Sequence, residues 1–400
     1  MNTKRGPSSA WDVFAAFLRL GLTSFGGPIA HLGYFDAEFV RRRKWLDEST
    51  FVQVVALCQF LPGPASSQVA IIIGLIRGGV LGAALAWLAF TLPSAIALTA
   101  FALGIARIAG VAEAPWIRGL LIAAVAVVAV AVSNMYRSLC PDNPRKTVAF
   151  VAAAVILLLP VSGFVQVAVI VLGAIYGRFF IEPPESKTQP IPIPGNRISA
   201  ILCAVAFLVL LVGFPIAQRF VFYGPFNVFG AFYESGALVF GGGHVVLPLL
   251  EARVVPPGWI GSDAFLAGYG AAQAVPGPLF TFAAYLGAAM HGPVSGIGGA
   301  ALALVAIYLP SFLLIAAVLP FWNDFIANPK LVAALQGVNA AVVGLLMAAL
   351  YQPVWVNAIR GPADAALALL AFVLLAVWKA PPWIVVVLSA LAAQLLHVLK

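Results

Sequence analysis

Long uninterrupted apolar stretches are the feature that most restricts how this chain can fold. Residues 79–106, 117–135 and 331–350 each supply the roughly 20 apolar residues that an α-helix needs to cross a bilayer. Only 9% of the 400 residues are charged, against about 25% in a soluble globular protein, so most of the surface must face lipid. The runs lack the apolar–polar alternation of barrel strands. The sequence therefore predicts an all-α, polytopic membrane protein.

Hydrophobic segments divide the chain into about thirteen parts. The pairs 147–159/162–180 and 362–378/382–399 can each be read as two short helices, or as one long tilted span with an interfacial piece. Between 181 and 196 the sequence IEPPESKTQPIPIPGN carries five prolines and predicts an extended polar linker. The remaining segments lie near 12–33, 51–76, 79–106, 117–138, 198–220, 227–250, 262–289, 293–320 and 331–354.

The chain contains two diverged copies of one unit. FLRLGLTSFGGPIAH at 17–31 aligns with FYESGALVFGGGHVV at 232–246. Pro-Gly-Pro and Leu-Pro-Ser then recur in the same order, which apolar composition alone would not produce. We predict a first repeat over 1–180, a linker over 181–197, and a second repeat with one extra leading span over 198–400.

The number of spans before the second copy decides its orientation. If seven segments cross, the second copy is inserted upside down, which is a common basis for alternating access. The positions of the basic residues favour seven spans with the N-terminus inside. One exception is RRRK at 41–44, which would then lie outside; a re-entrant first segment would remove this conflict but would change the parity.

Two kinds of helix break recur in both copies. The first is Gly-rich, in SFGGPIAH (24–31) and VFGGGHVVLP (239–248), and the second is Pro-Gly-Pro, in CQFLPGPASSQ (58–68) and AQAVPGPLFTF (272–282). Proline removes a backbone donor and glycine permits unusual backbone angles, so a helix cannot run undisturbed through these motifs. At membrane depth the freed backbone groups must face protein or a watery cavity.

Each break also creates a helix N-terminus, where unpaired N–H groups and a partial positive charge of about +0.5 favour an anion. In the first copy Ser66, Ser67 and Gln68 follow Pro-Gly-Pro and could add polar donors. The second copy has Phe280, Thr281 and Phe282 at these places. We therefore expect the first copy to make most polar contacts to an anion. The alternative is that the glycines only let helices pack closely.

Three further residues are candidates for the same site. His31 and His244 lie near the Gly-rich breaks and could titrate during transport, although a histidine hydrogen-bonded between helices is the simpler interpretation. Arg19 lies inside an apolar segment and aligns with Glu234. An intramembrane cation could attract an anion, or it could reach the membrane surface or form an ion pair.

Other functional classes find little support. No hydrolase, nucleotide-binding or metalloprotease pattern occurs, and Cys58, Cys140 and Cys203 are isolated, so we expect no enzyme activity, no cofactor and no metal. The net charge of +8 fits basic loops at a membrane better than nucleic-acid binding. Transport would then draw on an ion gradient or the membrane potential.

The segment GLTSFGGPIAHLGYFDAEFVRRRKWLDESTF, followed by ALCQFLPGPASSQ, resembles the chromate transporter family. FGGGHVVLPLLE and GYGAAQAVPGPLF in the second copy show the same resemblance, which covers nearly the whole chain and fits the duplicated form of the family. It implies a plasma-membrane carrier that exports chromate and confers resistance, driven by the membrane potential or protons, with halves of opposite orientation.

The candidate substrate-binding residues are therefore the cation Arg19 and the positions that match the family's motifs. In the first copy these are Phe25, Gly26, Gly27, Pro28, His31, Gln59, Pro62, Gly63, Pro64, Ser66, Ser67 and Gln68. In the second copy they are Gly241, Gly242, Gly243, His244, Gln273, Pro276, Gly277 and Pro278.

Three hypotheses follow for the function. The leading one is a chromate exporter, whose partners are the oxyanion and the lipid bilayer; a homodimer is compatible with it. The second is a carrier of sulfate or another oxyanion, because chromate and sulfate are both tetrahedral dianions. The third is a membrane scaffold or sensor that transports nothing.

Overall fold

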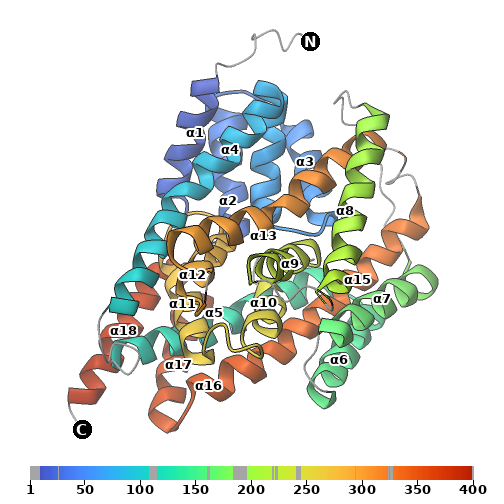
Figure 1. Cartoon of the computed structure of the whole chain (residues 1–400). Coiled ribbons are helices and arrows are strands. Elements are labelled where there is room, and N and C mark those ends of the chain that lie inside the picture. The colour runs from blue at the N-terminus through green and yellow to red at the C-terminus, as the bar shows by residue number, and fades with distance from the viewer. Residues whose placement is uncertain are drawn as a thin grey trace.

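The computed structural model describes residues 10–25, 27–107, 115–159, 163–182, 196–218, 220, 224–239, 245–292, 294–322, 324 and 328–398. Within these ranges the chain is helical and has no strand, so the all-α prediction is confirmed (Figure 1). The central part of the predicted linker, residues 183–195, lies outside the described residues.

Helices of the first copy follow the repeat found in the sequence. A π-helical turn, Asp36–Arg42, follows the second helix. The helices are α1 (Ala10–Thr23), α2 (Gly27–Phe35), α3 (Glu48–Phe60), α4 (Ala65–Arg107), α5 (Pro115–Leu139), α6 (Asn143–Leu158) and α7 (Gly163–Phe180).

The second copy repeats this order after one extra helix. A 3-10 turn, Leu279–Thr281, precedes α12, and a π-helical turn, Leu350–Trp355, follows α15. The helices are α8 (Arg197–Ala217), α9 (Gly224–Ala237), α10 (Val246–Val254), α11 (Ser262–Ala274), α12 (Phe282–Ala289), α13 (Gly296–Val318), α15 (Pro329–Ala349), α16 (Val356–Ala358), α17 (Pro362–Ala376) and α18 (Pro382–Val398).

The chain reverses direction at the first Gly-rich break. The ring of Phe17 in α1 lies 5.9 Å from that of Phe35 and 4.8 Å from that of Phe39, between centroids. A helix running straight on would separate positions 17 and 35 by about 27 Å. The chain therefore turns back between α1 and α2, and residues 12–33 are not the single straight segment that the sequence predicts.

The other three breaks reverse the chain in the same way. In the second copy Phe265 of α11 stacks edge-on against Phe282 of α12 at 5.2 Å, and Ser235 of α9 donates to the Leu249 carbonyl of α10 at 3.4 Å. In the first copy the Arg77 guanidinium of α4 lies 5.4 Å from the ring of Trp45, which comes just before α3. The chain after Pro-Gly-Pro therefore returns to the start of α3.

A further turn divides α4 into two arms, residues 65–77 and 80–107. Gly79 has φ +60, and a Cβ on Gly74 would overlap the Gly82 carbonyl, so the two arms pack closely. Gly287 and Gly299 make the equivalent contact between α12 and α13. The turn lies where the sequence divides segment 51–76 from segment 79–106.

These hairpins remove the conflict over the basic cluster at 41–44. Arg43 and Arg77 both lie over the Trp45 ring, and Gly78 lies against Val13 near the start of α1. The cluster is thus on the same side of the molecule as the start of α1. Two of the seven hydrophobic segments before the second copy thus fold back on themselves.

Five described stretches are long and apolar enough to cross a bilayer, by length and composition. Shorter apolar helices, such as Pro362–Ala376 and Pro382–Leu396, fall below that length. The chain is therefore a multi-pass membrane protein, although the count of thirteen spans stays a prediction. The five stretches are Ala65–Gly104, Pro115–Leu139, Arg197–Ala217, Gly296–Phe321 and Pro329–Ala358.

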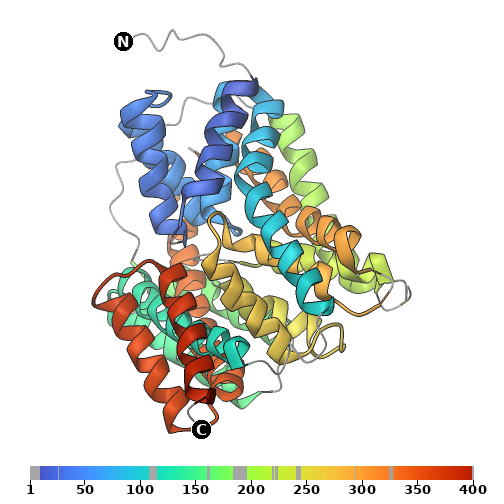
Figure 2. The same ribbon diagram turned by 90° about the vertical axis from the view of Figure 1, so that its left-hand side faces the viewer.

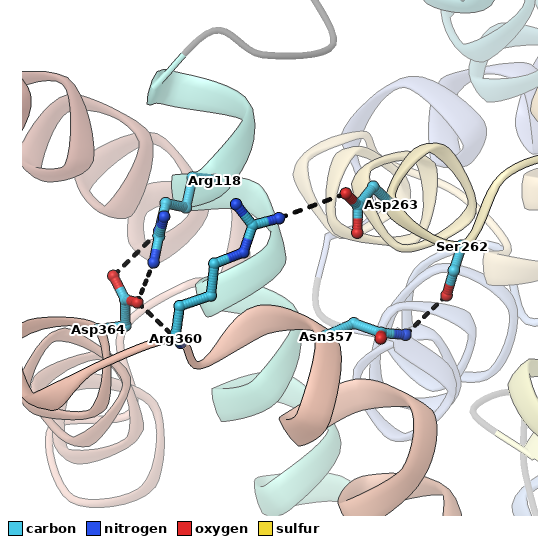
Figure 3. A network of polar contacts seen from close by, with 6 residues as sticks. All are labelled: Arg118, Ser262, Asp263, Asn357, Arg360 and Asp364. Carbon is cyan, nitrogen blue, oxygen red and sulfur yellow. Dashed lines mark hydrogen bonds and ion pairs between the residues drawn. The ribbon is translucent and has the colours of Figure 1, made fainter.

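Close packing and a polar network join the two halves. Gly119 of α5 lies directly against the Ser389 carbonyl of α18, as expected where small residues let membrane helices approach. Figure 3 shows the network near the start of α5, where Arg118 pairs with Asp364 of α17. Figure 2 shows the blue N-terminal helices at one end and the red C-terminal helices at the other.

Candidate functional site

The helix breaks of the two copies hydrogen-bond to one another. The Gly63 amide of the first Pro-Gly-Pro donates to the Val239 carbonyl at 2.6 Å, and the Gly277 amide of the second donates to the Ser24 carbonyl at 2.9 Å. Gly63 and Gly277 are equivalent positions, as are Ser24 and Val239. Such a reciprocal pair of contacts is the mark of a two-fold axis between the halves.

Two serines complete this arrangement. A Cβ on Gly63 would lie 2.6 Å from Ser311 Oγ, and one on Gly277 would lie 2.8 Å from Ser94 Oγ. Ser94 and Ser311 end the two Leu-Pro-Ser motifs that mark the repeat in the sequence. Each serine therefore lies against the Pro-Gly-Pro break of the opposite copy. The hydroxyl at the same place in both copies was the signal that could have identified them.

His31 connects the two breaks of the first copy. Its Nε2 lies 3.2 Å from the Ser24 carbonyl and its Nδ1 lies 3.3 Å from Ser66 Oγ. Because a carbonyl only accepts, Nε2 carries a hydrogen and donates to Ser24, while Nδ1 has the Ser66 hydroxyl as its partner. Both nitrogens of the fully buried ring are thus used, which favours the interpretation of His31 as a histidine hydrogen-bonded between helices.

The first turn of α4 follows directly on Pro64 and is buried. Gln68 Nε2 donates to the Pro62 carbonyl at 2.7 Å and reaches Ser311 Oγ at 3.4 Å, which holds the break closed. Ser67 Oγ is buried, and its polar neighbour is the Tyr308 hydroxyl. The amides at the start of α4 lack intrahelical acceptors, so this buried helix end has the positive potential that favours an anion.

The equivalent turn of the second copy is less polar. Thr281 Oγ1 donates to the Pro278 carbonyl at 2.7 Å, so its hydroxyl hydrogen is used within the turn. Phe280 and Phe282 beside it are buried. The two copies therefore offer unequal surroundings at related places.

A sequence model described as chromate transporter matches residues 11–178 and 226–394, once for each copy. The chain belongs to the chromate transporter family. The two matched ranges cover most of the chain and leave 179–225 between them.

Curated relatives from three bacteria extend this finding. The chain is 29% identical to the chromate transport protein of Pseudomonas aeruginosa, over 89% of this chain and 84% of that protein. It is 28% identical to that of Cupriavidus metallidurans, over 90% and 85%, and 28% identical to a probable chromate transport protein of Synechococcus elongatus, over 83% and 81%. No solved structure matches the chain.

Residues of the family's motifs do not all lie at the meeting point of the breaks. Gln59 is exposed at the end of α3, whereas Gln273 is half-buried and its Nε2 has no partner. Phe25 is half-buried and its ring lies 5.9 Å from that of Trp383. Gly27 begins α2 with φ +77, and the backbone of Pro28 continues that helix.

The other predicted site residues are buried, half-buried or outside the described residues. Pro64 and Pro278 are buried, while Pro62 and Pro276 are half-buried. Gly26 and the second Gly-rich break lie outside the described residues; the latter comprises Gly241, Gly242, Gly243 and His244.

Arg19 differs from the other candidates, because it lies on the exposed side of α1. Its counterpart Glu234 is buried and pairs with Arg253 of α10. Arg19 therefore points away from the buried face of α1. At Pro-Gly-Pro the positive potential comes instead from the N-terminus of α4.

Proposed function

We propose that this chain is a secondary active transporter that exports chromate across the plasma membrane and thereby confers chromate resistance. The observation that carries the proposal is the reciprocal contact between the breaks, Gly63 to Val239 and Gly277 to Ser24. Broken helices that meet at a repeat interface are where secondary transporters bind their substrates. The curated relatives named as chromate transport proteins supply the substrate.

Anion recognition follows from the chemistry of the site. The buried N-terminus of α4 offers backbone amides, and Ser66, Ser67 and Gln68 surround it. Like Pro62 and Pro64, these residues belong to the proposed substrate site, to which we also assign Gly27 and Gly277. Arg19 remains in the proposal as an exposed cation that attracts the anion toward the protein.

The membrane potential gives the direction of transport. An inside-negative potential is worth about 2.3 kcal/mol per charge per 100 mV, hence roughly 4.6 kcal/mol per 100 mV in favour of a dianion leaving the cell. We further propose that the repeats extend over 1–180 and 198–400, joined by 181–197, and that the second copy is inverted. The two-fold related hairpins would then open to opposite sides in turn.

Inside-out vesicles test this function. We expect uptake of radiolabelled chromate that depends on the membrane potential, with sulfate added as a competitor. Uptake of sulfate without chromate would make the chain a carrier of another oxyanion. The absence of flux for any oxyanion would favour the scaffold or sensor hypothesis.

A further inference from the structure

Two equivalent hydroxyl groups meet between the copies. Thr91 precedes Leu-Pro-Ser in the first copy and Tyr308 precedes it in the second, so the two residues occupy the same place in the repeat. The Tyr308 hydroxyl faces the hydroxyls of Thr91 and Ser67. Since equivalent residues can touch only near the axis that relates them, this cluster lies on the pseudo-two-fold axis.

The hydroxyls of this cluster are buried and have no hydrogen-bond partner outside it among the described residues. Ser67, Thr91 and Tyr308 are 1%, 3% and 1% exposed, and the only polar neighbours of their oxygens are one another. Tyr233 and Tyr285 are equally buried, yet their hydroxyls donate to the Phe207 and Ala264 carbonyls at 3.1 and 2.9 Å. Three buried hydroxyls whose only polar neighbours are one another leave hydrogen-bonding capacity unused, which points to a ligand-binding role.

The indole of Trp87 lies beside the same cluster. Trp87 lies one turn before Thr91 on the same face of α4, and its ring packs edge-on against that of Tyr308 at 5.5 Å. Its buried Nε1–H also has no partner. An indole N–H can only donate, and the amides that begin α4 next to Ser67 also only donate.

We infer that Ser67, Thr91 and Tyr308, with the Trp87 indole, form the cradle that binds a tetrahedral oxyanion on the axis between the two copies. The inference rests on the proposed transport function and adds to Ser67 three residues, Thr91, Tyr308 and Trp87, that the family motifs do not include. The indole N–H and the amides at the start of α4 only donate, the three hydroxyls can donate, and the cluster contains no carboxylate, so it matches a ligand that carries only acceptor oxygens. A site on the axis has the same relation to both copies, as alternating access requires.

Tyr308→Phe tests the inference in the full-length protein purified in detergent. The variant removes a hydroxyl whose only polar neighbours are the Ser67 and Thr91 hydroxyls, so the thermal unfolding midpoint without anion should fall less than in a variant that loses a hydrogen bond to a backbone carbonyl. The apparent affinity for chromate, measured by thermal shift and by vesicle uptake, should fall about tenfold to hundredfold, because a hydrogen bond to a charged group is lost. Thr91→Val should behave in the same way.

Tyr233→Phe is the matched control. It removes a satisfied hydroxyl from a buried tyrosine outside the cluster, so it should lower the unfolding midpoint and leave the chromate affinity unchanged. The opposite pattern, with Tyr308→Phe less stable but unchanged in affinity, would make the cluster purely structural and overturn the inference.

The outcomes separate the inference from the function on which it rests. A wild-type protein that neither binds nor transports chromate or sulfate refutes the proposed function. A wild-type protein that binds chromate, with Tyr308→Phe and Thr91→Val binding it equally well, refutes the cradle alone. If Tyr308→Phe fails to fold, Thr91→Val decides.

Discussion

Replacing Gly63 by alanine perturbs the meeting point of the breaks with the smallest possible side chain. Gly63 has φ +124, a backbone conformation that costs a residue with a Cβ about 1–3 kcal/mol. The new Cβ would also lie 2.5 Å from Gln68 Nε2 and 2.6 Å from Ser311 Oγ. Crowding of this kind in a packed interior costs about 1–3 kcal/mol, so the total is about 2–6 kcal/mol.

Gly292→Ala is the control that isolates the two contributions. Gly292 has nearly the same backbone angle, φ +121, but nothing lies within 4 Å of its future Cβ. It should therefore show only the backbone strain of about 1–3 kcal/mol. The excess in Gly63→Ala over Gly292→Ala measures the crowding against Gln68 and Ser311.

The assay combines stability with transport in the same two variants. Thermal unfolding midpoints in detergent give the stability difference, membrane fractionation confirms insertion, and vesicle uptake of chromate gives activity. We expect Gly63→Ala to insert and to lose transport, because the hydrogen bond from its amide to Val239 joins the two copies. Bulky residues at Gly63 or Gly27 should abolish chromate resistance altogether. If Gly63→Ala were no less stable and no less active than Gly292→Ala, the close packing of the breaks would be wrong.

Two further predictions concern the frame around the site. Asp364→Ala should lower the free energy of unfolding by about 1–3 kcal/mol, because Asp364 is mostly buried and accepts from Arg118 and a backbone amide. The control Asp263→Ala breaks an exposed ion pair and should lower it by about 0–1 kcal/mol. Equal unfolding midpoints of the two variants would contradict this. Single cysteines at Ala10 and Lys44, in a protein whose native cysteines are replaced, should react with an impermeant reagent from the same side of the membrane, and labelling from opposite sides would exclude the hairpin of α1 and α2.

Membrane class, duplication and the places where helices end were all determined by the sequence. Apolar runs with few charges require lipid as solvent, and Pro-Gly-Pro at 62–64 and 276–278 must interrupt a helix, because proline lacks the donor and glycine permits angles such as φ +124. The inequality between Ser66-Ser67-Gln68 and Phe280-Thr281-Phe282 was also readable from the residue types alone. These properties depend on local chemistry, which a linear pattern contains.

The direction of the chain after each break was decided by tertiary structure. Glycine and proline say where a helix stops but not where the chain goes next, which depends on contacts such as Phe17 with Phe35. For this reason segment 12–33 was predicted as one piece and is a hairpin, and the cluster at 41–44 lies beside the start of α1. The meeting of Thr91 with Tyr308 was equally hidden, because their side chains differ and only the packing of the two copies across an axis brings them together.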